Sequence, residues 1–502
     1  MIFQKKYIRF TLLILVMTIL SMCAKNPVSG MPDFVTITEQ QEISIGASYH
    51  QSILEEHKLL KDREINQYFN SLGKKIAKQS HRPELKWHFT LIDNPTFNAF
   101  ATPGGYVYFY RGILAYFNSE AELAGVIGHE IAHITARHAV RGMSTAQVTN
   151  ILIGLVASRV PGSQLTNNAF NLMNQIINRG YSRKYELEAD KIAEEYLLRS
   201  GYDPSAMSSF LKTMKNVDDL EVRIAKEEGR QPNIGYHGIF STHPATEKRI
   251  EALESKSKNK QKSDNKEKFL KMIDGLPYGS SPDEGFVKNN IFYHADLAIK
   301  FNILEPWILK NLPDKLIISK NNSSMIIRYE ELLKDDIDNG ITPKKFLDEG
   351  INKTSFLSRN ELIESESFNT NNLNAHTILY SSKGFNKTTY KRFTAIFDIN
   401  NKNPYNTQAK PKVWIFVTTS DNLKDDNESK IMFKKFSKMT KNEIDNAKGL
   451  KIRVIRFREG MTYEKLAKQS PLGKYAEDKL RLLNGHYPDQ DPNIGDLIKI
   501  VE

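Results

Sequence analysis

The stretch His129-Glu130-Ile131-Ala132-His133 constrains this 502-residue chain more than any other feature of its sequence. On a helix, at about 100° per residue, the two histidines lie roughly 40° apart, and Glu130 falls within the same arc. Both imidazoles can therefore bind one Zn²⁺ ion while the carboxylate reaches a water molecule beside it. Zinc lowers the pKa of water from about 15.7 to about 7, and a neighbouring carboxylate can then take the proton. The stretch predicts a hydrolytic zinc site with Glu130 as the general base.

The residues around the motif favour a helix. Ser119-Glu120-Ala121-Glu122 has the form of a capping box, which starts helices. Apolar residues then recur at helical spacing, at Leu123, Val126, Ile127, Ile131 and Ile134. The alternative interpretation is a core helix that buries two structural histidines.

A catalytic zinc ion needs a third protein ligand. His138 lies about 140° around a continuous helix from His133, so we expect it to point elsewhere, as a supporting or structural histidine. Glu186 and Asp190 are four residues apart on a predicted helix and share a face. Glu186 can bind zinc while Asp190 accepts a hydrogen bond from a ligand imidazole. A surface helix with ordinary carboxylates is the alternative.

A short sheet is predicted just before the metal helix. Trp87–Ile92 and Tyr106–Tyr110 alternate like strands, and Pro103-Gly104-Gly105 forms a turn between them. An edge strand beside a metal helix can pair with an extended peptide substrate, whereas an ordinary hairpin would bind nothing. The residues that we assign to a substrate-binding edge are Asn98, Ala99 and Phe100.

Five stretches between about residues 30 and 255 together resemble one known family. They are Asn98–Gly105, Ser119–His133, Ser182–Asp190, Gly201–Met207, and Thr242-His243-Pro244 followed by Arg249. The family is the gluzincin-type zinc endopeptidases that include HtpX, the type I CAAX prenyl endopeptidases and the periplasmic protease BepA. The resemblance implies that His129, His133 and Glu186 bind one catalytic Zn²⁺ ion, that Glu130 is the base, and that Asp190 supports a ligand.

The resemblance also implies roles for two later residues. His243 matches a family histidine that can approach the metal and occupy its open position in a resting state. Arg249 matches a partner near that site. An exposed His-Pro turn before an amphipathic helix would explain His243 as plain structure.

The segment between the two predicted metal helices, residues 142–180, is long. Ala146–Ser158 within it is largely apolar but too short to span a bilayer. We expect a helix that covers the cleft as a lid, with simple core packing as the alternative.

The first 22 residues have the pattern of an export signal. Basic residues precede an apolar run from Phe10 to Leu20, as in a secretory signal peptide. Leu20-Ser21-Met22-Cys23 resembles a bacterial lipobox, and Cys23 is the only cysteine of the chain. We predict lipid attachment at Cys23, which would anchor the protein to a membrane. Ala24, rather than Asp, favours the outer membrane over the inner one, on the periplasmic side of the cell envelope. An uncleaved membrane anchor is the alternative.

Charge adds little about partners. The net charge is +11, which in an exported protein does not suggest nucleic acid, although anionic lipid or cell-wall polymer could be attracted. We expect polypeptide substrates, such as unfolded or outer-membrane proteins, a membrane contact through the lipid anchor, and no nucleic acid.

The second half mixes strands and helices. Lys315–Ile318 and Met325–Arg328 flank Asn321-Asn322 like a hairpin. Residues 392–399 and 412–418 are predicted as further strands, and residues 431–447 as a helix. No helical repeat like that of BepA is present.

The last stretch reads as a turn into a helix at Gly460–Ala467, a second helix that ends at Leu482–Gly485, and a closing strand at Ile494–Ile500. This order is similar to a LysM-type glycan-binding module, which suggests peptidoglycan as a partner. A capping subdomain that binds nothing is the alternative.

We therefore expect an α+β protein: a mainly helical gluzincin metalloprotease domain with a small sheet, an α+β accessory domain and a small LysM-like module. The expected boundaries are 1–22 for the signal peptide, 23–254 for the protease domain, 255–284 for a charged linker, 285–447 for the accessory domain and 448–502 for the module. The expected function is a lipid-anchored zinc endopeptidase that cuts unfolded or misassembled envelope proteins. The alternative is a chaperone-like or peptidoglycan-associated scaffold with a latched, weakly active zinc site.

Overall fold

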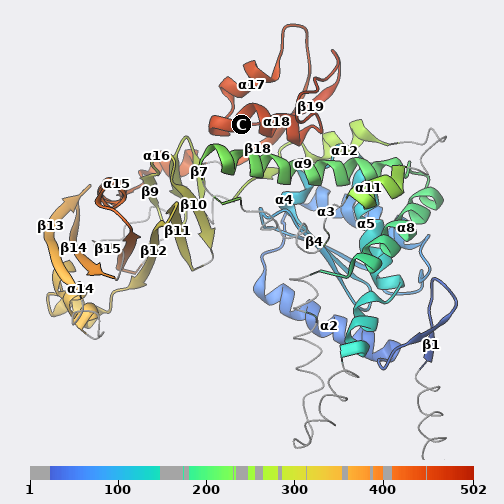
Figure 1. Cartoon of the computed structure of the whole chain (residues 1–502), viewed down its shortest axis with the longest axis horizontal. Coiled ribbons are helices and arrows are strands. Elements are labelled where there is room, and N and C mark those ends of the chain that lie inside the picture. The colour runs from blue at the N-terminus through green and yellow to red at the C-terminus, as the bar shows by residue number, and fades with distance from the viewer. Residues whose placement is uncertain are drawn as a thin grey trace, which may run out of the picture.

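The computed structural model of the chain describes residues 23–146, 173, 180–229, 231–232, 243, 247–254, 264–280, 285–312, 314–352, 360–384, 388–399, 410–447 and 449–502. A helical part with a small sheet lies to the right in Figure 1, a part built on a large sheet lies to the left, and the C-terminal segment lies above. This mixture of helices and sheets confirms the α+β class.

The N-terminal half is mainly helical. Its helices are α2 (Glu39–Glu56), α3 (Arg63–Ala77), α4 (Arg111–Leu114), α5 (Glu120–Thr135), α8 (Arg183–Ser200), α9 (Ser205–Glu227) and α11 (Glu247–Glu254). A small antiparallel pair, β1 (Cys23–Lys25) and β2 (Pro32–Phe34), precedes them. The core between these helices is apolar and continuous, with Phe69, Ile127 and Phe210 almost fully buried.

The small sheet contains β3 (His88–Ile92), β4 (Ala99–Thr102) and β5 (Tyr106–Tyr110) in the order β3-β5-β4. β3 runs parallel to β5, and β4 pairs with β5 in antiparallel register, with Phe100 opposite Tyr108. The predicted turn at residues 103–105 therefore joins β4 to β5. In the described part of the chain β4 pairs on one side only, which leaves it as an edge strand.

The metal helix α5 starts as its sequence predicts, with one difference. The Ser119 side chain accepts a hydrogen bond from the Glu122 backbone N–H at 3.1 Å. The Glu122 carboxylate reaches back to the N–H of Asn118, one residue earlier than in a capping box. Every residue of α5 is buried, because α8 and α9 pack against it.

Helix α5 ends where Arg137 takes the left-handed conformation, with φ 56°. The Arg137 guanidinium fixes this turn by donating to Glu42 Oε2 at 2.9 Å and to the Ile37 carbonyl at 3.0 Å. Residues 138–146 are helical again after the turn. Because of this break, residues 138–146 do not continue the helix geometry of α5.

The expected linker at residues 255–284 is wrong for its described part. Residues 266–273 form helix α12 (Lys266–Ile273), and Phe269, Leu270 and Ile273 are buried in the same core as α5. Strand β6 (Pro277–Tyr278) follows it. The charged residues between the apolar ones hid an amphipathic helix, because only one of its faces is apolar.

The C-terminal segment contains β18 (Leu450–Arg456), α17 (Tyr463–Gln469), the 3₁₀ turn η2 (Gly473–Tyr475), α18 (Ala476–Leu483) and β19 (Leu497–Val501). Its sheet has the order β19-β18-β6, so β6 from before the accessory part completes it. The buried Lys499 ammonium donates to the carbonyls of Ala115 and Phe117, each at 2.7 Å. The segment shares its core with the N-terminal half rather than forming a separate one.

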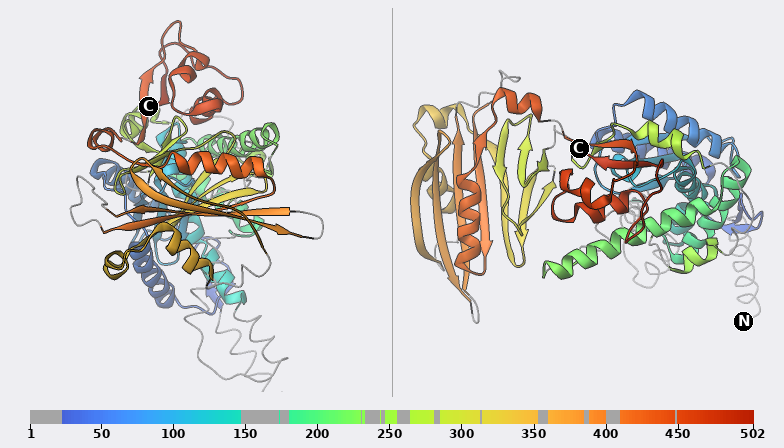
Figure 2. Two further views of the ribbon diagram at one scale, coloured as in Figure 1. Left: turned by 90° about the vertical axis from the view of Figure 1, so that its left-hand side faces the viewer. Right: turned by 90° about the horizontal axis from the view of Figure 1, so that it is seen from above.

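The accessory part is built on a seven-stranded antiparallel sheet in the order β10-β11-β12-β16-β15-β14-β13. These strands are β10 (Ile308–Leu312), β11 (Lys315–Lys320), β12 (Ser323–Glu331), β13 (Glu361–Thr370), β14 (Leu373–Lys383), β15 (Thr388–Asp398) and β16 (Lys412–Ser420). Helix α14 (Pro343–Asn352) covers one face and α15 (Leu423–Lys434) the other, as the left view of Figure 2 shows. Both faces are apolar, and their clusters contain no residue of the N-terminal core.

Smaller elements complete the accessory part. A second sheet contains β7 (Phe286–Lys288), β8 (Ile291–His294), β9 (Ile299–Asn302) and β17 (Ser437–Lys438), and two short helices are α13 (Lys334–Asp338) and α16 (Lys441–Asn446). The predicted hairpin around Asn321-Asn322 is confirmed by the pairing of β11 with β12. The predicted helix at residues 431–447 is confirmed at its two ends, where residues 431–434 lie in α15 and residues 441–446 form α16. It is wrong in between, because Ser437 and Lys438 pair with β9.

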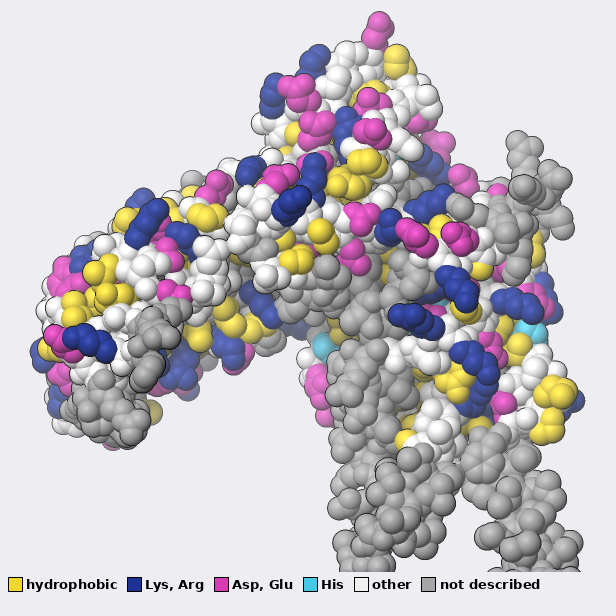
Figure 3. Space-filling model, viewed as in Figure 1, with side chains coloured by type: hydrophobic (Ala, Val, Ile, Leu, Met, Phe, Trp, Pro, Cys, Tyr) yellow, Lys and Arg dark blue, Asp and Glu magenta, His cyan; other side chains and the backbone are white. Residues whose placement is uncertain are grey.

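None of the described helices is both long enough and apolar enough to cross a bilayer. On the face seen in Figure 3, basic and acidic side chains are interspersed, so the net positive charge is not gathered into one patch there. The predicted signal peptide and the predicted lid helix lie outside the described residues, apart from Ala146 at the start of the latter.

Candidate metal centre

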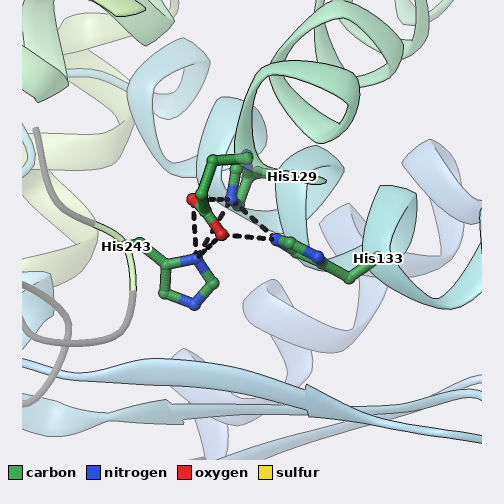
Figure 4. A group of neighbouring side chains, drawn as sticks. His129, His133 and His243 are labelled. Carbon is green, nitrogen blue, oxygen red and sulfur yellow. Dashed lines mark hydrogen bonds and ion pairs between the residues drawn. The ribbon is translucent and has the colours of Figure 1, made fainter. Parts of the chain in front are cut away.

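Helices α5 and α8 bring three predicted ligands together (Figure 4). The Nε2 atoms of His129 and His133 are 3.0 Å apart. Glu186 Oε2 lies 3.3 Å from His129 Nε2, and Glu186 Oε1 lies 3.5 Å from His133 Nε2. All three side chains are buried, so they face one another in a nearly dry space.

His243 joins this group as a fourth donor. Its Nδ1 lies 3.0 Å from both Glu186 oxygens and 3.3 Å from His129 Nε2. Figure 4 shows its ring edge turned toward the other ligands. Its second nitrogen, Nε2, lies 3.7 Å from Glu130 Oε1, so this histidine spans the space between the ligands and the predicted base.

The donor set fits a tetrahedral zinc ion. Ligand atoms about 2.0–2.1 Å from a tetrahedral Zn²⁺ lie roughly 3.3 Å from one another. The distances from His129 to His133, Glu186 and His243, and from Glu186 to His133 and His243, fall between 3.0 and 3.5 Å. One donor atom from each of the four residues lies within 4.8 Å of the others. Three nitrogens and one carboxylate are also a chemistry that zinc accepts.

A second layer of charge orients the ligands. Asp190 Oδ1 lies 3.0 Å from His129 Nδ1, which fixes that ring with Nε2 toward the cluster. Arg249, on α11, binds both Asp190 oxygens at 2.7 Å each. Its Nη1 also lies 3.2 Å from Glu186 Oε2 and donates to the His243 carbonyl at 3.1 Å. The buried Arg249 guanidinium therefore binds three groups of the site: the candidate ligand Glu186, Asp190 beside His129, and the backbone of His243.

The electrostatics match anionic carboxylates around a positive centre. Burial alone would raise the pKa of Glu186, but the neighbouring His243 and His129 outweigh it and hold that pKa well below its usual range. Burial likewise opposes ionisation of Asp190, and Arg249 outweighs it, so its pKa is lowered. Burial disfavours protonated His129, yet its hydrogen bonds to Asp190 and Glu186 raise its pKa to about 9.

Glu130 differs from the other carboxylates. It is fully buried, and neither of its oxygens has a hydrogen-bond partner among the described residues. Burial raises the pKa of its carboxyl above the ordinary value. A desolvated carboxylate beside a metal site, with two unused acceptor atoms, is suited to accept a proton.

The edge strand lies beside the metal helix. β4 contacts α5 and pairs with β5 on its other side, with Ala99 opposite Phe109. Asn98, which is 8% exposed, precedes the strand, and its side-chain Oδ1 has no hydrogen-bond partner in the described part of the chain. Ala99 and Phe100 are themselves buried, so the strand offers its backbone rather than these side chains.

His138 lies outside the donor cluster, as predicted, but it points toward His133 rather than away from it. Its Nδ1 is 2.8 Å from His133 Nδ1, whereas a continuous helix would have pointed it away. The left-handed turn at Arg137 breaks the helical geometry on which that expectation rested. A buried contact across such a turn has no signal in helical periodicity.

Two tyrosines of the site were not predicted. The ring of Tyr181 stacks on His133 at 4.0 Å and 13°, and the ring of Tyr185 stacks on His138 at 4.4 Å and 12°. Both precede or begin α8, close to Glu186. The sequence could have indicated these two tyrosines, because they lie within five residues of the predicted ligand Glu186.

The family model of peptidase family M48 matches residues 63–257, a range that contains every residue of this centre. Residues 63–257 belong to peptidase family M48. We call residues 63–257 the M48 domain; it contains the whole donor cluster of His129, His133, Glu186 and His243.

Similar proteins share this domain. The beta-barrel assembly-enhancing protease of Escherichia coli (strain K12) is 32% identical over 225 residues, which cover 43% of this chain and 43% of that one. The mitochondrial metalloendopeptidase OMA1 of Schizosaccharomyces pombe is 32% identical over 187 residues, which cover 37% and 51%. The chain therefore spans about half the length of the curated relatives it matches, or less.

Among solved structures the likeness is weak. Cyanobacterial PsbP (CyanoP) from Synechocystis sp. PCC 6803 matches with a TM-score of 0.23 and 11% identity, covering 30% of this chain and 93% of that chain.

Proposed function

We propose that this chain is a zinc-dependent endopeptidase of the bacterial cell envelope that hydrolyses peptide bonds in unfolded or misassembled envelope proteins. The observation that carries the proposal is the buried cluster of His129, His133 and Glu186 next to the Glu130 carboxylate, which accepts no hydrogen bond from the described residues. The names of the similar proteins, which include a beta-barrel assembly-enhancing protease, support envelope proteins as the substrate class.

His129, His133 and Glu186 would hold one Zn²⁺ ion. When bound, the ion supplies a positive charge that polarises the scissile carbonyl and acidifies water. Glu130 takes the proton from the attacking water at a carboxylate oxygen and passes it to the leaving amine nitrogen. Its burial favours this role, because desolvation makes the carboxylate a stronger base.

The β4 edge would bind the substrate. An extended peptide can add to an edge strand through backbone hydrogen bonds, which suits a protease that accepts many unfolded sequences. Asn98 Oδ1, which has no hydrogen-bond partner among the described residues, can accept a hydrogen bond from a substrate N–H. Pairing with Ala99 and Phe100 would present the peptide alongside α5, the helix that carries both ligand histidines.

His243 would close the site in a resting state. It occupies the position of a fourth ligand, 3.0 Å from Glu186, where a catalytic zinc site needs an open position. Turning away would open that position, and His243 or Arg249 could then hold the developing oxyanion. This closure is also what favours the second candidate function, a chaperone-like scaffold whose latched zinc site turns over slowly.

The place of action is proposed from the sequence. Residues 1–22 would be removed as a signal peptide, and Cys23 would carry the lipid that anchors the protein to the periplasmic side of the envelope, with the outer membrane favoured. The helix and strand order of the C-terminal segment supports a LysM-like contact with peptidoglycan. Because this segment shares its core with the M48 domain, peptidoglycan binding is tested on the whole chain.

The test compares purified residues 24–502 with their Glu130→Gln variant for cleavage of casein and of an unfolded porin, with zinc counted in both. We expect zinc in both proteins and cleavage by the wild type alone. Zinc in both with cleavage in neither would favour the latched scaffold, and a gain of cleavage in His243→Ala would then identify the latch. Absence of zinc from both would contradict the ligand assignment.

A further inference from the structure

A chain of polar contacts leads from the ligand His133 to the edge of the domain. His133 Nδ1 lies 2.8 Å from His138 Nδ1. On the other side of the His138 ring, Nε2 lies 3.4 Å from Glu188 Oε2. Glu188 in turn accepts a hydrogen bond from Arg141 Nη1 at 3.2 Å. The other ligand, His129, meets a carboxylate directly, so the two histidines are supported in different ways.

We propose that Glu188, His138 and His133 form a polar relay, in which His138 is the positioning residue that holds His133 in the tautomer able to bind metal. The proposal rests on the zinc site proposed above. It assigns a role to His138 and Glu188, which lie outside the ligand set.

The tautomers of all three groups follow from the contacts. His133 Nε2 faces the other ligands and must keep its lone pair for the ion, so its proton is on Nδ1. That proton can be donated only if His138 Nδ1 accepts it, because two N–H groups cannot face each other at 2.8 Å. The proton of neutral His138 is then on Nε2, which faces Glu188 Oε2 at 3.4 Å, an ion-pair distance rather than a formed hydrogen bond. This assignment of tautomers is consistent with both contacts of the His138 ring.

Charge explains why an imidazole stands between the ligand and the carboxylate. Glu130, Glu186 and Asp190 already place three carboxylates in the buried site. A fourth one directly on His133 would have to be desolvated as well, which costs several kcal/mol unless it is paired. The His138 ring is neutral in this assignment and passes the orienting effect outward to Glu188, which is 29% exposed and is paired with Arg141.

Stacking holds the relay in one geometry. Tyr181 stacks on His133 and Tyr185 on His138, both nearly parallel. The Arg141 guanidinium lies 4.7 Å from the centre of the Tyr185 ring, so the same arginine braces both Glu188 and the stack. Because each imidazole stacks on a tyrosine ring, neither can rotate without breaking that stacked contact.

The experiment measures zinc affinity by competition with a chromogenic chelator, in residues 24–502 carrying His138→Phe or His138→Gln. Phe keeps a ring for stacking but cannot accept a hydrogen bond, so we expect zinc binding about 10–100-fold weaker than in the wild type. Gln offers a carbonyl acceptor, so it should restore most of the affinity. ¹⁵N-histidine spectra should report the His133 proton on Nδ1 in the wild type and in His138→Gln.

Two further variants make the test specific. His376→Phe alters another buried histidine, on β14, and should leave zinc affinity unchanged. Glu188→Ala removes the last acceptor without touching the core and should weaken zinc binding by a smaller factor, about three- to tenfold. Thermal melting shows whether His138→Phe folds. If it does not fold, Glu188→Ala still tests the relay.

Each outcome decides the proposal. Unchanged zinc affinity in both His138→Phe and Glu188→Ala would overturn it while leaving the proposed function intact. Equal weakening in His138→Gln and His138→Phe would mean that His138 only packs against His133, which also overturns the relay. A wild type that binds no zinc would contradict both the proposed function and the relay.

Discussion

Gly46 lies where helix α2 crosses the turn that precedes β5. A Cβ atom at this position would lie 1.8 Å from the Pro103 carbonyl oxygen, which belongs to the backbone and cannot move aside. We expect Gly46→Ala to lower the free energy of unfolding by about 1–3 kcal/mol, the usual cost of overpacking. Urea denaturation of residues 24–502 measures the change.

The matched control is Gly350→Ala in helix α14. A Cβ at Gly350 meets nothing within 4 Å, and the residue is exposed and helical. Alanine is the better helix former by up to about 1 kcal/mol, so this substitution should be neutral or stabilising. Destabilisation by both variants to the same degree would contradict the close approach of α2 to the turn.

At the residue scale the sequence predicted the centre well because the ligands fall at helical spacings. His129 and His133 share one turn of α5, and Glu186 and Asp190 share one turn of α8, so local geometry places each pair. His138 was misplaced because the left-handed Arg137 is fixed by Glu42 and Ile37, which lie about a hundred residues away. No local pattern encodes such a contact.

At the element scale, the start of the metal helix depends on one buried carboxylate. Glu120 accepts hydrogen bonds from Tyr68 and Lys268 on Oε2 and from Tyr202 and Asn265 on Oε1. Burial would raise its pKa, but these four bonds outweigh burial and lower that pKa to about 2. They therefore favour the charged form in the folded state.

The sign of the pH dependence follows from this lowered pKa. Glu120 contributes its full stability above about pH 4.5, and the contribution is lost as pH falls toward 2, because the unfolded chain binds the proton first. We expect Glu120→Gln to be less stable than the wild type at pH 6 and to show a shallower loss of unfolding free energy between pH 4.5 and 2. Urea titrations at several pH values measure the free energy of unfolding, and substitution of the exposed Glu84 (Glu84→Gln) is the control. Parallel curves for wild type and Glu120→Gln would refute the assignment.

Elements with a local start signal were predicted better than elements made by pairing. The hairpin at Asn321-Asn322 is confirmed, since its turn residues specify it. Helix α15 instead runs from Leu423 to Lys434, so it begins eight residues before its predicted start at residue 431 and ends well before its predicted end at residue 447. The residues after it join β9, and such long-range pairing leaves little trace in a short window of sequence.

At the scale of the whole molecule, the accessory part is an insertion between two paired strands. Leu450 of β18 pairs with Tyr278 of β6, so the chain leaves and re-enters the M48 core at neighbouring points. Adjacent strands are only about 5 Å apart, a gap that a short linker spans. We expect a protein with residues 281–448 replaced by a four-residue Gly-Ser linker to keep the thermal transition and zinc content of the M48 core. Loss of cooperative melting would contradict the separation of the two cores.

The C-terminal segment, unlike the accessory part, should not be removable without loss of the fold. Tyr463, Leu480 and Val501 are buried in the M48 core, and Lys499 satisfies two carbonyls just before α5. We expect residues 24–447 to lose cooperative unfolding, because truncation exposes this apolar surface and leaves buried carbonyls unsatisfied. Differential scanning calorimetry checks it. A sharp transition in residues 24–447, or in the isolated residues 448–502, would show that the segment is an independent module.

The sequence by itself determined which side chains share a helix face in the candidate metal centre. The spacing of His129, Glu130 and His133 and that of Glu186 and Asp190 place each set on one face, because a helix repeats every 3.6 residues whatever surrounds it. The family resemblance already predicted His243 and Arg249 near the metal. Only the tertiary structure decided that Arg249 binds Asp190 and that His138 lies against His133. It also decided that residues 264–280 and 449–502 belong to the M48 core, since burial depends on which apolar faces meet rather than on local composition.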